Sequence, residues 1–161
     1  MNKGAWLVVV CAAAGLYIML NRKWTPPEAA QPYLADIMAA EYQYGMPRYL
    51  LARLLYQESR YRQDIIAGET TSSAGAVGIA QIVPRWHPEV DPLNPVASIY
   101  YAAKYLAKLK TRFGDWETAL AAYNWGPTAV SNSMKTAGEK WLASAPTETQ
   151  NYVSEIWGDV A

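Results

Sequence analysis

A glutamate stands where a leucine-rich helix would place a core residue. Residues 53–60 read R-L-L-Y-Q-E-S-R. Helical steps of three, four and seven residues back from Glu58 land on Leu55, Leu54 and Leu51, so the carboxylate continues an apolar stripe. Burial and the negative pole of the helix C-terminus both disfavour the ionised form. A carboxyl group held protonated near neutral pH suits general-acid cleavage of a glycosidic bond.

A buried ion pair is the alternative explanation for Glu58. Arg53, Arg60 and Arg62 lie close enough along the chain to be its partner. The stripe alone does not decide between a structural ion pair and a catalytic acid, and the other segments of the chain bear on the choice.

The composition argues against several other kinds of site. The 161 residues include one cysteine, Cys11, and one histidine, His87. We therefore predict no intramolecular disulfide and no metal site built from His and Cys. Nucleophilic mechanisms that use a histidine would need His87, which lies in R-W-H-P and is interpreted as a structural or solvated loop residue. Fourteen basic and fourteen acidic residues give a net charge of zero without a basic run, so nucleic-acid binding is not expected.

The N-terminal segment has the composition of a membrane anchor. Residues 4–20 carry no charge and are flanked by Lys3 and by Arg22-Lys23. We expect residues 1–23 to be a single transmembrane anchor, with a cleaved signal sequence as the alternative. Residues 24–31, which include Trp24 and two prolines, are expected to form a short stiff linker.

Residues 32–161 are predicted to form one compact all-α domain. Their apolar residues recur at helical spacing, and we find no convincing run of alternating residues. The segment from Gly75 to Val83 is expected to be a short helix or a turn. Proline, glycine and capping residues place the helices as follows: Pro32 to Gly45, Met46 to Ser59, Asn94 to Gly114, Asp115 to Gly126, a short helix from Pro127, and a last one from Thr147, where T-E-T-Q fits a capping box.

Four short motifs occur in order along this domain. They are Q-E-S (57–59), G-A-V-G-I-A-Q (75–81), A-L-A-A-Y-N-W-G-P (119–127) and E-T-Q-N-Y-V (148–153). Together they resemble the catalytic domain of the soluble lytic transglycosylase family, related to goose-type lysozyme. That family's pattern is E-S, G-x-x-G-L-M-Q, A-Y-N-A-G-P and E-T-x-x-Y-V. The resemblance covers roughly residues 33–157 and implies a lysozyme-like helical fold.

The resemblance also implies which residues catalyse the reaction and which bind the substrate. Glu58 corresponds to the family's sole catalytic acid, and the family needs no cofactor. The positions implied for substrate binding are Ser59 beside the acid, Ser72, Gln81 in the cleft, Tyr123 near the acid, and the cleft-shaping Asn124, Glu148 and Tyr152.

The activity that the resemblance implies is lytic cleavage of peptidoglycan. The family's glutamate protonates the oxygen between N-acetylmuramic acid and N-acetylglucosamine, and then takes the proton of the muramic acid 6-hydroxyl as a 1,6-anhydro ring closes. A goose-type muramidase, which adds water with the help of a second acid such as Asp64 or Glu69, is the alternative within the same fold. A non-catalytic glycan-binding component of an envelope machine is the alternative from another class.

The sequence departs from the family pattern at three places. G-L-M-Q reads Gly78-Ile-Ala-Gln81, so Ala80 replaces a methionine. Trp125 replaces an alanine, and its ring either adds an aromatic wall for stacking or merely fills space. The loop between Glu58 and Gln81 is a few residues longer, which weakens the correspondence of Ser72.

The substrate implies a setting outside the cytoplasmic membrane. With residues 4–20 as an anchor, the catalytic domain is expected to face the periplasm. The resemblance is compatible with local wall opening for a secretion, conjugation or pilus machine. It is equally compatible with a phage lysis enzyme or virion component, or with secretion after signal cleavage.

Overall fold

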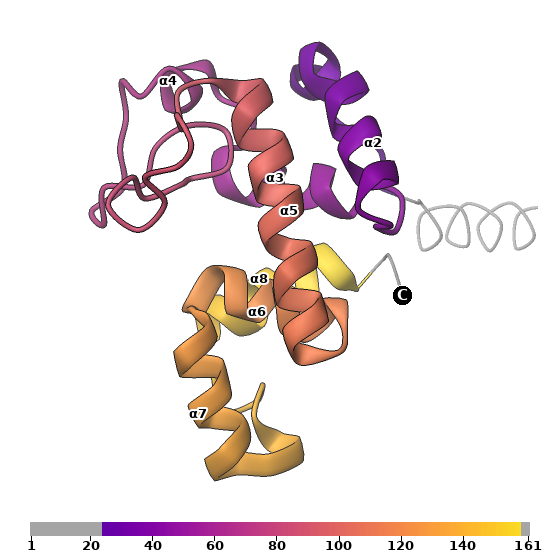
Figure 1. Cartoon of the computed structure of the whole chain (residues 1–161), viewed down its shortest axis with the longest axis vertical. Helices are drawn as coiled ribbons and strands as arrows, with labels where there is room; N and C mark the ends of the chain where they lie inside the picture. Colours follow the sequence, from indigo (N-terminus) through magenta and orange to yellow (C-terminus); the bar gives the residue numbers. More distant parts are fainter. Residues whose placement is uncertain (1–23, 159–161) are drawn as a thin grey trace, which may run out of the picture.

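Helix α5 (Pro95–Phe113) runs through the middle of the molecule and carries helices at both of its ends (Figure 1). The computed structural model describes residues 24–158. Helix α2 (Leu34–Gln43) packs against α5, and α6 (Trp116–Trp125) packs against it as the chain returns. The remaining elements are η1 (Glu28–Tyr33), α3 (Leu50–Ser59), α4 (Gln63–Ile66), α7 (Pro127–Ala137), η2 (Gly138–Lys140) and α8 (Thr147–Trp157). The predicted all-α class is confirmed for residues 24–158, where two residues make one isolated β-bridge.

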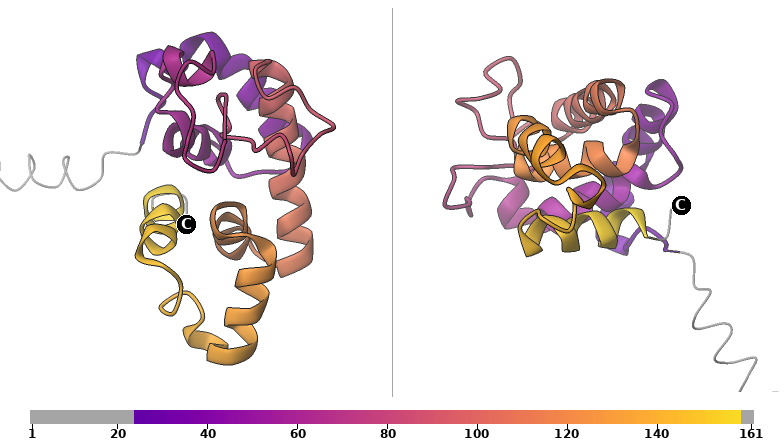
Figure 2. Two further views of the ribbon diagram at one scale, coloured as in Figure 1. Left: turned by 90° about the vertical axis from the view of Figure 1, so that its left-hand side faces the viewer. Right: turned by 90° about the horizontal axis from the view of Figure 1, so that it is seen from below.

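Helix α3 lies in the interior of the domain. All six residues from Leu50 to Leu55 are buried, and the four leucines among them are 0% exposed. Each such leucine contributes roughly 1.5–3 kcal/mol relative to an exposed one. Figure 2 shows α8 beside α3 and α6, although α8 is far from α3 in the sequence. The helix that carries Glu58 is therefore held firmly from several sides.

A buried carboxylate fixes the start of α3. Glu41, in α2, is 4% exposed. Its Oε1 accepts hydrogen bonds from the backbone N–H groups of Leu51 (2.9 Å) and Ala52 (3.3 Å), and its Oε2 accepts one from Tyr49 (3.0 Å). These are N–H groups that the first turn of a helix leaves without partners. We expected the helix to begin at Met46, but it begins at Leu50 because Glu41 caps it from another helix.

The caps of α5 and α6 lie where the sequence predicts them. Asn94 accepts a hydrogen bond from the N–H of Ala97, and Asp115 accepts one from Thr118. The expected capping box at Thr147 is wrong, because α8 begins after Pro146 and has no side-chain cap. Gln150 instead donates to the backbone oxygens of Ala143 and Ala145.

The expected anchor, residues 4–20, lies outside the described residues. Within residues 24–158 no helix has the length and apolar character to span a membrane. Residues 24–31, expected as a linker, pack on the domain. The ring of Trp24 lies at 5.9 Å from that of Tyr49, and Ala30 is fully buried in the core.

The motif G-A-V-G-I-A-Q forms a tight turn, one of the two expected possibilities. Val77 and Ile82 exchange two backbone hydrogen bonds of 3.0 Å, which closes the turn. Gly78 has a φ of +78°, and a Cβ built on it would lie 1.9 Å from the backbone oxygen of Pro92. Only glycine fits there, so the turn is fixed against the segment that leads into α5.

We predict that Gly78→Ala destabilises the domain by about 2–4 kcal/mol, because a methyl group meets backbone that cannot move aside. Gly75→Ala is the matched control. Gly75 has a φ of +79° but open space around its Cβ position, so we expect about 1 kcal/mol from backbone strain alone. Urea denaturation measures both. Equal losses at the two positions would show that the contact with Pro92 does not constrain the turn.

Candidate active site

Glu58 lies in the last turn of α3, immediately before the chain turns away. Arg60 and Tyr61 both have left-handed φ angles, +52° and +54°. The Oγ of Ser59 donates to the backbone oxygen of Leu55 and accepts from the N–H of Tyr61, which fixes this turn. The helix therefore ends at Ser59, one residue after Glu58, whose side chain is half-buried.

The surroundings of Glu58 favour its protonated form. Burial raises the pKa of the Glu58 carboxyl to about 7. The hydroxyl of Tyr152 donates to Oε1 at 2.6 Å, which lowers the pKa in part, and the charge of Glu148 raises it further. At neutral pH this carboxyl group is therefore divided between its acid and its base form.

The alternative of a buried ion pair is not what the structure contains. Within residues 24–158, no cation forms a salt bridge with Glu58. Arg62 pairs with Asp64 at 2.6 Å, and Arg60 lies 3.8 Å from Glu155. Arg53 donates to the backbone oxygens of Glu155 and Ile156. The carboxyl group of Glu58 therefore stays available to donate and to accept a proton.

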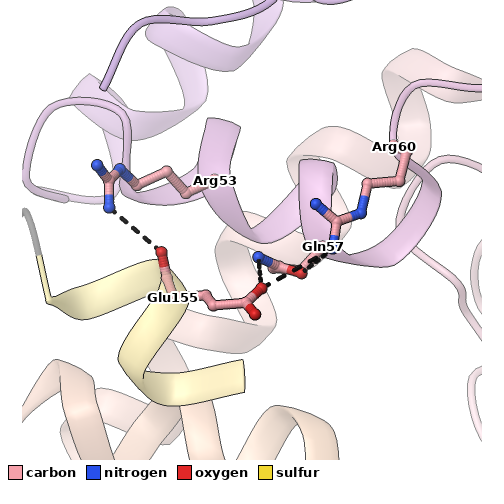
Figure 3. A network of polar contacts seen from close by, with 4 residues as sticks. All are labelled: Arg53, Gln57, Arg60 and Glu155. Carbon is pink, nitrogen blue, oxygen red and sulfur yellow. Dashed lines mark hydrogen bonds and ion pairs between the residues drawn. The ribbon is translucent and has the colours of Figure 1, made fainter. Parts of the chain in front are cut away.

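A polar network joins α3 to α8 one helical turn from the Tyr152–Glu58 hydrogen bond (Figure 3). The Nε2 of Gln57 donates to the carboxylate of Glu155, and Arg60 donates to Oε1 of Gln57 at 2.8 Å. Arg53 holds the backbone of the same part of α8. Gln57 precedes Glu58 in the chain, and Glu155 follows Tyr152 by three residues. The network therefore holds α3 and α8 together close to the hydrogen bond between Tyr152 and Glu58.

Tyr123 connects Glu58 to the motif turn. Its hydroxyl donates to the backbone oxygen of Ala80 at 3.0 Å. Burial and the nearby charge of Glu58 raise the pKa of Tyr123 well above its usual value. We expected Tyr123 to lie near the acid, and the charge of Glu58 does act on it; the direct hydrogen bond to Glu58 comes from Tyr152.

A cavity of about 680 Å³, which we call the cleft, opens beside Tyr123. The motif turn, the loop after it, α5 and the junction of α6 with α7 form its walls. The cleft is lined by Gln81, Ile82, Val83, Trp86, His87, Tyr101, Tyr105, Ala122, Tyr123, Asn124, Gly126, Pro127 and Thr128. Glu58 does not line the cleft, but its charge acts on Tyr123, which does.

The structure brings several predicted site residues together. Gln81, Tyr123 and Asn124 line the cleft, and Tyr152 contacts Glu58. Gln81 has a left-handed φ of +47°, and its side-chain amide donates to the oxygen of Gly78. Its position at the cleft is thus set by the turn itself.

The surroundings of four predicted positions differ. Ser59 is fully buried, with its hydroxyl used inside the chain. Ser72 is exposed, and its Oγ accepts from the N–H of Ala76. Asn124 accepts a hydrogen bond from Thr149 at 2.8 Å, which ties α6 to α8. Glu148 is exposed and acts on Glu58 through its charge. Trp125 packs against the core and does not line the cleft, so it fills space.

Sequence reasoning missed the aromatic wall of the cleft. His87, interpreted as a loop residue, packs against Tyr101 and Tyr105 with ring centroids 5.5 and 5.1 Å away. Its Nδ1 lies 2.7 Å from the Tyr101 hydroxyl. Trp86 is 68% exposed beside it. The signal was the spacing of Tyr101 and Tyr105, one helical turn apart on α5.

The two acids considered for hydrolysis do not line the cleft. Asp64 pairs with Arg62 and accepts from Thr70 at 3.0 Å, and this hydrogen bonding to Arg62 lowers its pKa. Glu69 is exposed on the same loop. Among the described side chains, no three His, Cys, Asp or Glu residues gather to hold a metal ion.

Comparison with known proteins agrees with this arrangement. The chain matches the transglycosylase SLT domain over residues 36–143. It is also 33% identical, over 103 residues, to a protein of Enterobacteria phage PRD1 named transglycosylase. That match covers 62% of this chain and 37% of the phage protein, so the chain spans little more than a third of that relative's length. Glu58, Gln81 and Tyr123 fall inside the matched region, and the chain belongs to the transglycosylase SLT domain family.

Proposed function

We propose that this chain is a peptidoglycan lytic transglycosylase in which Glu58 serves first as general acid and then as general base. The observation that carries the proposal is the half-buried Glu58, which has a pKa of about 7, forms no ion pair among residues 24–158 and acts on Tyr123 of an aromatic-walled cleft. A group with that pKa is present in both protonation states near neutral pH, as the two halves of the reaction require.

The reaction balances with one carboxyl group. Glu58 gives its proton to the glycosidic oxygen as the bond from C1 of N-acetylmuramic acid breaks, which releases the 4-hydroxyl of N-acetylglucosamine. The substrate's acetamide stabilises the oxocarbenium-like centre. The 6-oxygen of the same muramic acid then bonds to C1, and its proton returns to Glu58. Water is neither consumed nor released.

Two features support ring closure over addition of water. Hydrolysing glycosidases normally use a second carboxylate to activate water or to act as nucleophile. Asp64, one of the two acids considered for that role, is held by Arg62 and Thr70, and Glu69 is exposed on the same loop and does not line the cleft. The tyrosines near Glu58 can instead orient the acid and the substrate: Tyr152 donates to the acid, and Tyr123, whose pKa the charge of Glu58 raises, lines the cleft.

The setting we propose is local opening of the cell wall, with the domain outside the cytoplasmic membrane and residues 4–20 as its anchor. The similarity to a protein of phage PRD1 supports a phage enzyme that acts during entry or lysis. Wall opening for a secretion, conjugation or pilus machine is the alternative setting, and periplasmic localisation of the full chain in a bacterial host tests the anchor.

Glu58→Gln should abolish release of products ending in 1,6-anhydromuramic acid, because the amide cannot donate the proton. We expect a fall of about 100-fold or more in rate. Mass spectrometry of the muropeptides released from purified peptidoglycan measures it. The matched controls are Asp64→Asn and Glu69→Gln, which should keep the anhydro products. Reducing-end products, heavier by one water and lost with either control, would instead establish a muramidase.

The rate should fall as the pH rises above about 7, because the protonated form of Glu58 is then lost. Well above that pH, kcat/KM should drop about tenfold per pH unit. In Tyr152→Phe the fall of kcat/KM should begin at a higher pH, since the hydroxyl that stabilises the ionised carboxylate of Glu58 is gone. A fall of kcat/KM that begins at the same pH in both proteins would show that Tyr152 does not act on the catalytic acid.

The stability of the domain should also report this pKa. Ionising Glu58 is easier in the unfolded chain, where its pKa is near 4.5, than in the folded one, where it is about 7. The wild type should therefore lose stability relative to Glu58→Gln as the pH rises from about 5 to 8, by about 1–3 kcal/mol. Urea denaturation at a series of pH values measures the difference. A difference independent of pH would contradict the raised pKa.

A further inference from the structure

A second cavity adjoins the cleft and is lined by α5 and the loop before it. This side cavity has a volume of about 640 Å³ and shares four lining residues with the cleft, Trp86, His87, Tyr101 and Tyr105. The residues that line the side cavity alone are Glu89, Lys104 and Lys108. Because the shared residues face both spaces, a ligand in the cleft can extend a branch into the side cavity without leaving the protein surface.

The wall between the two cavities is held in place by its own hydrogen bonds. The Tyr101 hydroxyl donates its only proton to Oε1 of Glu89 at 2.6 Å. Its oxygen therefore accepts from Nδ1–H of His87, 2.7 Å away. Tyr101 also stacks on Tyr105 with ring planes 12° apart. The wall is thus arranged before any ligand arrives, which reduces the entropy that binding costs.

The side cavity carries an excess of positive charge. Lys104 and Lys108 are exposed and lie one turn apart on α5, so their ammonium groups reach the same space. In the part of the chain between residues 24 and 158, neither lysine forms an ion pair. Of the residues that line the side cavity, Glu89 alone is acidic, and its Oε1 already accepts from Tyr101. Two cations against one engaged carboxylate suit an anionic ligand.

We propose that the side cavity binds the peptide branch that peptidoglycan carries on its muramic acid residues, with Lys104 and Lys108 pairing with the carboxylates of that peptide. The inference rests on the proposed function, because the glycan in the cleft must be the one that bears the peptide. The exposed ring of Trp86, which lies at both cavities, offers apolar contact for the small side chains of the branch.

The side cavity makes the protein prefer peptide-bearing strands over bare ones, but it does not supply most of the binding free energy. Exposed ion pairs are individually weak and are screened by salt. Two of them support a preference of about tenfold for peptide-bearing strands over bare ones at low ionic strength. The bare glycan has no group for the lysines, so its binding depends on the cleft.

The test measures binding to the full chain carrying Glu58→Gln, so that the strands are not cleaved. The probes are two soluble glycan strands of equal length, one with its peptides and one stripped of them by an amidase. Calorimetric titration gives Kd for each strand, and the readout is the ratio of the two Kd values. The ratio is measured again after adding Lys104→Gln and Lys108→Gln together, and after adding Lys135→Gln, an exposed lysine on α7 that lines neither cavity.

We expect the parent to prefer the peptide-bearing strand by about tenfold, with the preference shrinking in high salt. The double lysine variant should reduce the ratio to near one, and Lys135→Gln should leave it unchanged. Equal binding of the two strands by the parent overturns the inference, as does an unchanged ratio in the double lysine variant or a lack of binding to either strand.

The outcome is separate from the test of the catalytic proposal. If Glu58→Gln still released anhydro products, the role of Glu58 would be wrong, and the preference would be read as the ratio of the cleavage rates of the two strands, which the double lysine variant should still bring to near one. If the glutamine variant were inactive and the ratio equal to one, the catalytic role would stand and the peptide site would fall.

Discussion

The site depends on keeping the carboxyl group of Glu58 largely out of water at the negative end of a helix. That arrangement disfavours the ionised group, so it persists only because the surrounding packing is firm. Buried leucines hold α3, and Glu41 caps its start. The network around Glu155 joins α3 to α8, which brings Tyr152 to the carboxyl. The packing of the domain therefore holds the Glu58 carboxyl group in surroundings that disfavour its ionised form. Such surroundings are typical of groups that transfer protons.

Much of this could be read from the sequence, because the signals were local. The leucine spacing before Glu58 predicted its stripe, and Asn94, Asp115 and the glycines after α5 and α6 marked helix ends. For the segment from Gly75 to Val83 the sequence left a short helix and a turn open, and the structure shows a turn in which Gly78 has no room for a side chain. Each of these depends on residues within a few positions of one another, and such short-range rules are what a single sequence displays.

The features that were missed depend on contacts between segments distant in the sequence. Glu41 caps a helix ten residues onward, a role that its own helix does not reveal. The hydrogen bond from Tyr152 to Glu58 joins residues 94 positions apart, so the two tyrosines near the acid could not be assigned from the motifs alone. His87 looked like an ordinary loop residue because its partners Tyr101 and Tyr105 come from the next helix.

The separation of 94 residues between Glu58 and Tyr152 has a consequence for the order of events during protein synthesis. When α3 leaves the ribosome, Glu58 is still in contact with water and has the acidity of an ordinary glutamate. Its special environment forms only after α8 has been made and has docked. The nascent chain therefore carries an ordinary glutamate at position 58 until a late stage of folding raises its pKa.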